Sequence, residues 1–91
     1  MVERHEAATW ALVALYPLES ESVTRWVLEI FDDKTRRIGE FVEELNEPKS
    51  REECVSDAEE ALRVQHNLYE PMGDSPPGFA YAECWWHLSP K

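Results

Sequence analysis

Basic residues are scarce in this chain: nine Lys and Arg stand against nineteen Asp and Glu, which gives a formal net charge of −10. A surface of this sign repels the phosphates of DNA and RNA, because nucleic-acid binding depends on Lys and Arg neutralising them. Anionic lipids also attract basic rather than acidic segments. The composition therefore disfavours direct binding to nucleic acid or to a membrane surface.

Glycine and long apolar runs are also scarce. The three glycines, Gly39, Gly73 and Gly78, are far apart, so the chain has no glycine-rich phosphate loop, dinucleotide fingerprint or nucleophile elbow. The longest apolar run, residues 7–18, contains a threonine and a proline and is too short to span a bilayer. The N-terminus lacks the basic region of a signal peptide. We therefore expect a cytoplasmic protein.

Only two cysteines are present, and in a reducing compartment we expect both to be free thiols. Cys54, Cys84, His66 and His87 are residue types that bind zinc. Cys54 and His66, however, would point about 120° apart on a helix. In a strand, Cys84 and His87 would point to opposite faces. We therefore expect no metal, no cofactor and no catalytic residue, and thus no enzyme.

Aromatic residues are plentiful, with four Trp, three Tyr and three Phe. Large side chains help a chain of 91 residues to bury enough area, and they argue against disorder. We expect one domain over residues 1–91, with frayed ends at residues 1–6 and 89–91.

The strongest local pattern predicts a helix over residues 50–69. Ser50 can act as the N-cap, and Glu53 stands at the capping-box spacing. Pro71 and Gly73 would end the helix. An apolar stripe with a 3.6-residue period is formed by Cys54, Val55, Ala58, Ala61, Leu62, Gln65, Leu68 and Tyr69.

Four other segments are predicted to be strands. Residues 7–16 are apolar on both alternating faces, which suits a strand covered on both sides or a buried helix. Residues 23–31 and 36–45 flank the turn at residues 32–35 and predict a hairpin. Residues 79–88 lie between proline-containing segments and have strand length.

Residues 23–45 also fit a second interpretation, because their apolar positions match a helical period. A single helix here would make the protein mostly α. The two aspartates of the turn, Gly39 and the β-branched residues argue for the hairpin. In that hairpin Thr24, Trp26, Leu28 and Ile30 would form one face of the first strand.

The resulting order is β-β-β-α-β, an α+β domain of two layers with one amphipathic helix packed on an antiparallel sheet. This predicted order resembles small hairpin-plus-helix modules such as the HicB antitoxin fold. The resemblance lies in topology and implies no function by itself.

Acidic residues concentrate between Glu40 and Glu60, where only Lys49 and Arg51 oppose them. Such a segment is either a solvated face or a surface matched to a basic partner. The residues that would bind this partner are Glu40, Glu43, Glu44, Glu47, Glu52, Glu53, Asp57 and Glu60.

Trp85 and Trp86 are the remaining candidates for partner binding. Adjacent strand residues point to opposite faces, so both cannot enter the same core layer. An exposed tryptophan would be a suitable anchor for a partner. It could also join an interface between two copies of the chain.

Small acidic inhibitors of phage origin, such as anti-CRISPR and anti-restriction proteins, are similar to this chain in size and charge, as are many antitoxins and immunity proteins. The resemblance implies a non-catalytic nucleic-acid mimic that binds a basic nuclease or toxin through charge complementarity. The alternative is a homodimeric structural or assembly protein that associates through its C-terminal aromatics or a sheet edge.

Overall fold

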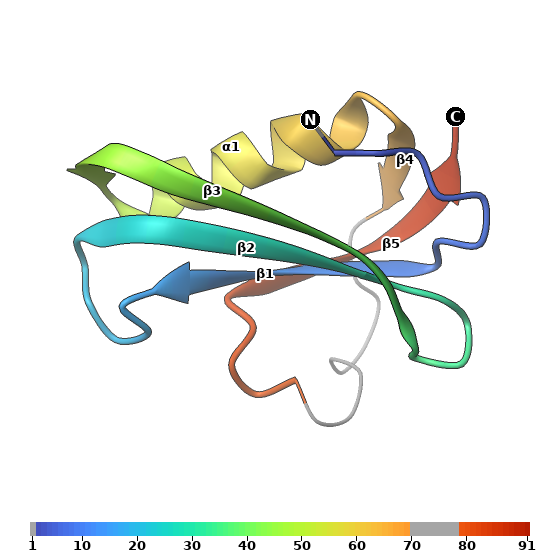
Figure 1. The fold of residues 1–91 in the computed structure, drawn as a ribbon, viewed down its shortest axis with the longest axis horizontal. Coiled ribbons are helices and arrows are strands. Elements are labelled where there is room, and N and C mark those ends of the chain that lie inside the picture. Colours follow the sequence, from blue (N-terminus) through green and yellow to red (C-terminus); the bar gives the residue numbers. More distant parts are fainter. Residues whose placement is uncertain (1, 70–78) are drawn as a thin grey trace.

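The computed structural model describes residues 2–69 and 79–91. It confirms the predicted α+β architecture, an antiparallel sheet with one helix packed on it (Figure 1). Along the chain the elements are β1 (Trp10–Tyr16), β2 (Val23–Phe31), β3 (Arg37–Lys49), α1 (Arg51–Arg63), β4 (His66–Tyr69) and β5 (Cys84–Pro90). Within these residues no helix has the length and apolar character needed to cross a membrane.

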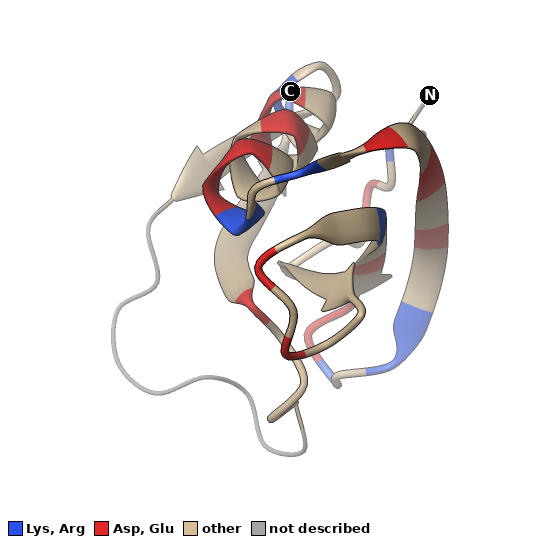
Figure 2. Ribbon diagram, turned by 90° about the vertical axis from the view of Figure 1, so that its left-hand side faces the viewer, with Lys and Arg blue, Asp and Glu red and all other residues tan. Residues whose placement is uncertain are grey.

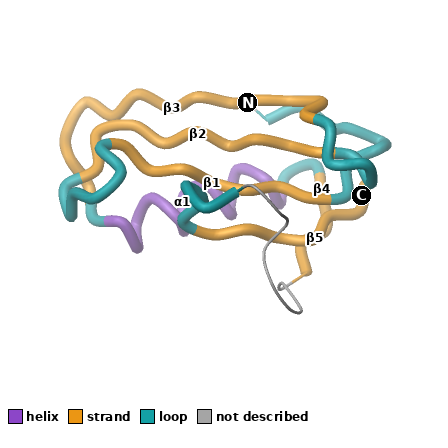
Figure 3. The backbone as a smooth tube through the Cα atoms, turned by 90° about the horizontal axis from the view of Figure 1, so that it is seen from below, coloured by secondary structure: helices purple, strands orange, loops and turns teal. Residues whose placement is uncertain are grey.

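The sheet has the strand order β3-β2-β1-β5-β4, so β3 and β4 form its edges. Figure 3 shows β3, β2, β1 and β5 one beside the next. The central strand β1 is buried at every position from Ala11 to Leu15. The helix lies over one face of this strand (Figure 1). On the other face, the Phe79 ring centroid lies 4.7 Å from that of Phe31, which is the β2 residue opposite Trp10. Burial on both faces explains the continuous apolar run of β1.

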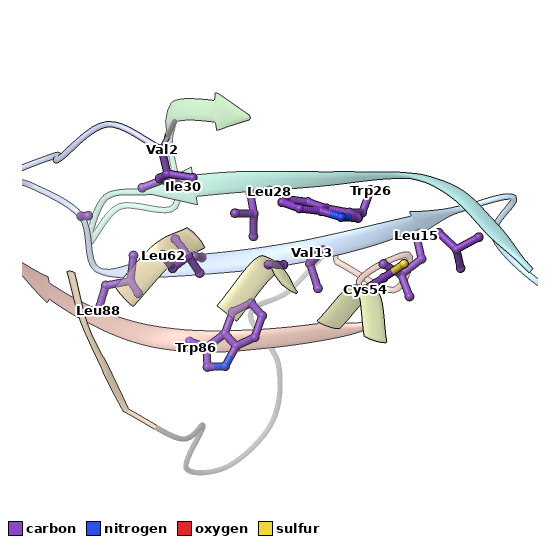
Figure 4. Close-up of a cluster of buried hydrophobic side chains, with 14 residues drawn as sticks. Val2, Val13, Leu15, Trp26, Leu28, Ile30, Cys54, Leu62, Trp86 and Leu88 are labelled. Atoms are coloured by element: carbon purple, nitrogen blue, oxygen red, sulfur yellow. The ribbon is translucent and has the colours of Figure 1, made fainter. Parts of the chain in front are cut away.

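The core lies between the sheet and the helix (Figure 4). The register of β2 places Trp26, Leu28 and Ile30 on the face that α1 covers. Thr24 does not share this face as expected: it is exposed, because the register between β2 and β3 shifts between Val23 and Arg25. From the helix, the fully buried side chains are Cys54, Ala58 and Leu62.

The helix begins as predicted and ends earlier. The Ser50 side chain accepts a hydrogen bond from Glu53 N–H at 3.2 Å, which is one half of a capping box. The helix ends at Arg63, and residues 66–69 form the short strand β4. This strand pairs with β5, so that Leu68 lies opposite Leu88. The predicted order therefore holds, with one additional short strand before the last.

Two other boundaries differ from the sequence-based expectation. β5 begins at Cys84, because the preceding residues form a turn in which Ala82 N–H donates to the Phe79 carbonyl. β3 continues to Lys49 and includes Pro48. A proline is tolerated there because an edge strand needs no donor on its outer side. At the N-terminal end, Val2 is buried in the core.

Candidate protein-interaction surface

Acidic residues are distributed along β3 and α1, two consecutive elements joined at Ser50 (Figure 2). Both elements have exposed sides, since β3 is an edge strand and only one stripe of α1 is buried. The acidic segment predicted from the sequence therefore lies along two partly exposed elements that meet at Ser50.

The register of β3 against β2 divides its carboxylates between the two faces of the sheet. Glu40 and Glu44 lie opposite Glu29 and Arg25, on the face away from the helix. Glu43 lies opposite Trp26, on the helix side. The outer edge of β3 is therefore flanked by negative charge on both sides.

One flank of α1 continues this region. The Asp57 carboxylate lies 2.9 Å from Lys49 Nζ at the end of β3, which places this flank next to the strand. Glu53 and Glu60 lie within about 60° of Asp57 on the helical wheel. The β3–α1 acidic surface is defined here as Glu40, Glu43, Glu44, Glu47, Glu53, Asp57 and Glu60.

Glu52 was expected in the same group, but it lies on the opposite flank of the helix. There it lines a hollow with Arg51, Glu83 and Cys84. Arg51 Nη2 is paired with Glu83 at 2.8 Å. Helical geometry thus separates Glu52 from the other acids of its segment.

Counter-charges compensate only part of the β3–α1 acidic surface. Glu40 pairs with Arg37 at 3.1 Å, and Glu44 pairs more loosely with Arg25 at 3.9 Å. In the described part of the chain, four members have no basic group within 4.0 Å: Glu43, Glu47, Glu53 and Glu60. Exposed ion pairs contribute only about 0–1 kcal/mol, so the paired members also remain available to a partner.

The two cations of the acidic segment are already engaged, Lys49 by Asp57 and Arg51 by Glu83 of the segment before β5. The hydrogen bond to Asp57 raises the pKa of Lys49. The hydrogen bond to Glu83 raises the pKa of Arg51 and, from the other side, lowers the pKa of Glu83. Neither cation therefore adds free positive charge to this end of the molecule.

The two candidate tryptophans point to opposite faces of β5. Trp86 is 5% exposed and packs in the core beneath α1 (Figure 4), which removes it from the candidate binding residues. A tryptophan in a closed core layer cannot touch a partner. Trp85 is half-buried on the other face, with its ring centroid 5.3 Å from that of Trp10 and 5.5 Å from that of His87. It lies on the β1–β5 side of the sheet, away from β3.

The cysteines are both free thiols. Burial raises the pKa of Cys54, and it also raises that of Cys84, so neither thiol is activated as a nucleophile. Among the described residues, no three His, Cys, Asp or Glu side chains are grouped as a metal site would require.

A buried histidine was not anticipated from the sequence. His66 is 0% exposed, and its Nε2 accepts a hydrogen bond from His5 N–H at 3.2 Å. The helix predicted over residues 50–69 includes His66. Only the alternating pattern of residues 66–69 could have indicated a strand.

Comparisons of the chain with protein-family models, curated proteins and solved structures gave no match. The function is therefore argued from the surface itself.

Proposed function

We propose that this protein is a non-catalytic inhibitor that uses the β3–α1 acidic surface to bind a basic, nucleic-acid-binding protein. One observation carries the proposal. Four carboxylates on two consecutive, solvent-facing elements have no basic group of the described chain beside them: Glu43, Glu47, Glu53 and Glu60. A partner with a Lys- and Arg-rich groove would supply these charges.

The mechanism is competition for a nucleic-acid site. Carboxylates occupy the positions of phosphates and form charge-assisted hydrogen bonds with Lys and Arg. The negative field of the surface speeds the encounter with a positive groove. A partner of this kind would be a nuclease or a toxin, and the protein would then act as a phage anti-defence protein, of the anti-CRISPR or anti-restriction type, or as an antitoxin in the cytoplasm.

A second function is favoured by a different surface. Tyr69 is 56% exposed and lies opposite His87 on the face that carries Trp10 and Trp85. Exposed aromatic groups of this kind form interfaces between proteins. The alternative is therefore a homodimer, with a structural or assembly role, that associates through this face.

Salt dependence distinguishes the two functions. Affinity capture from host extract is performed at low salt and again at about 0.5 M salt, which shortens the Debye length to a few Å. The proposed function predicts a nucleic-acid-binding protein that is retained at low salt and released at high salt. A dimer that persists at both salt concentrations, with no captured partner, would support the alternative and contradict the acidic inhibitor.

A further inference from the structure

β3 offers a long free edge. It has thirteen residues and pairs with β2 on one side. None of the described residues, 2–69 and 79–91, pairs with its other side. Alternate residues of an edge strand direct their N–H and C=O groups away from the sheet, so β3 presents a row of unused donors and acceptors.

The middle of this edge is regular. The two register shifts against β2 fall near the ends of β3, and the pairing from Gly39 to Glu44 is continuous. Bulges and prolines are the usual devices that keep another strand from adding to an edge. Pro48 lies outside the regular part. The opposite edge of the sheet, β4, has only four residues.

Charge decides which strand fits this edge. A second copy of β3 would bring two sets of glutamates onto neighbouring strands, and like charges on neighbouring strands are destabilising. An extended basic segment would instead place Lys or Arg beside Glu40 and Glu44 on one face and beside Glu43 on the other. Between Glu40 and Glu44, the side chain of Val42 is 44% exposed and offers an apolar contact.

We infer that β3 binds an extended basic segment of the partner as a sixth strand of the sheet. The recognised segment has five residues, with basic residues at the first and last positions and an apolar residue in the middle. The basic residues lie beside Glu44 and Glu40, and the apolar residue lies beside Val42. The inference rests on the proposed function and adds how the partner is held: backbone hydrogen bonds supply affinity, and alternating side chains supply specificity. The exposed ion pairs of Glu40 with Arg37 and of Glu44 with Arg25 would be exchanged for pairs with the partner.

A short peptide tests this inference. The probe is the capped peptide Thr-Arg-Thr-Val-Thr-Arg-Thr, and its control has the same side chains with N-methylated backbone amides. The control keeps the charges and the valine but loses the backbone donors. Binding to the isotope-labelled protein is measured by titration and by amide hydrogen exchange at low salt.

We expect the probe to bind and to slow exchange at alternate amides between residues 39 and 44, with no slowing in β4. The N-methylated control should bind about tenfold more weakly or worse, because several hydrogen bonds are lost. The double variant Glu40→Gln/Glu44→Gln should weaken probe binding about tenfold. The matched double variant Glu19→Gln/Glu21→Gln, in the exposed β1–β2 turn, should leave it unchanged.

Equal binding of the probe and its N-methylated control, or slowed exchange outside β3, would overturn the strand-addition inference. Absence of probe binding would overturn it as well. The proposed function would survive each of these results if a basic partner is still captured at low salt and released by high salt. It fails independently if no such partner is captured.

Discussion

At the scale of single residues, His66 is a titratable group enclosed in the fold. Its ring is fully buried, and it accepts a hydrogen bond from the backbone of His5. Burial is the largest cause that lowers its pKa below the ordinary value of 6.5, and the positive charges of His5 and Arg4 act in the same direction. The neutral form of His66 therefore belongs to the folded state.

The stability of the protein should consequently fall as the pH is lowered from about 7.5 to about 5.5. An unfolded histidine binds a proton as the pH falls through about 6.5, whereas folded His66 resists protonation. Lowering the pH therefore stabilises the unfolded state relative to the folded state. One such group contributes a slope of at most about 1.4 kcal/mol per pH unit. The measurement is the free energy of unfolding from urea titrations across this range.

The variant His66→Gln keeps an acceptor for His5 N–H and should flatten this dependence. The lowered pKa values of Asp32 and Glu83 affect stability mainly below about pH 5, where the carboxyl groups of the unfolded chain bind protons, so their effect lies below this pH range. An unchanged slope in His66→Gln would contradict this role.

At the scale of elements, α1 is held by a narrow buried stripe. Cys54, Ala58 and Leu62 are each 0% exposed, and Leu62 is the largest of them. Isolated helices of this length are marginal in water, so packing on the sheet maintains this one.

Leu62→Ala should therefore destabilise the protein by about 2–5 kcal/mol, because it removes buried methyl groups and leaves a cavity. The control is Val64→Ala, at a residue that is 56% exposed at the end of the same helix, which should change stability by no more than about 0.5 kcal/mol. Both values come from chemical denaturation. A loss below about 1 kcal/mol for Leu62→Ala would show that the stripe does not face the core.

The elements that could be predicted from sequence are those with a local cause. The Ser50 cap, the stripe from Cys54 to Leu62 and the hairpin of β2 and β3 were all visible in the pattern. β4 was not, because Leu68 fits both the helical and the alternating period. The pairing of Leu68 with Leu88, twenty residues away, decides in favour of the strand.

The candidate surface was predictable only in part, for a similar reason. Sequence alone places the acids in one segment, but the sides on which they lie depend on register and helical phase. The register of β5 sends Trp86 into the core, and the phase of α1 turns Glu52 away from β3. Both outcomes depend on contacts with distant strands.

At the scale of the whole molecule, the uneven distribution of charge is the central feature. Net charge alone favours solubility and resists self-association. Carboxylates without a basic neighbour are concentrated on β3 and on one flank of α1, so the negative charge is unevenly distributed over the surface (Figure 2). A basic partner should therefore approach this side of the molecule, rather than any acidic position.

The most direct measurement compares two variants of equal charge in affinity capture at low salt. One variant changes Glu43, Glu47 and Glu53 to Lys, and the other changes the exposed Glu6, Glu19 and Glu21 to Lys. Each reversal adds two charges, so three reversals move the net charge from −10 to −4 in both variants. The account predicts that only the first variant loses the basic partner. Equal retention by both variants, or equal loss from both, would contradict a binding site on the β3–α1 acidic surface.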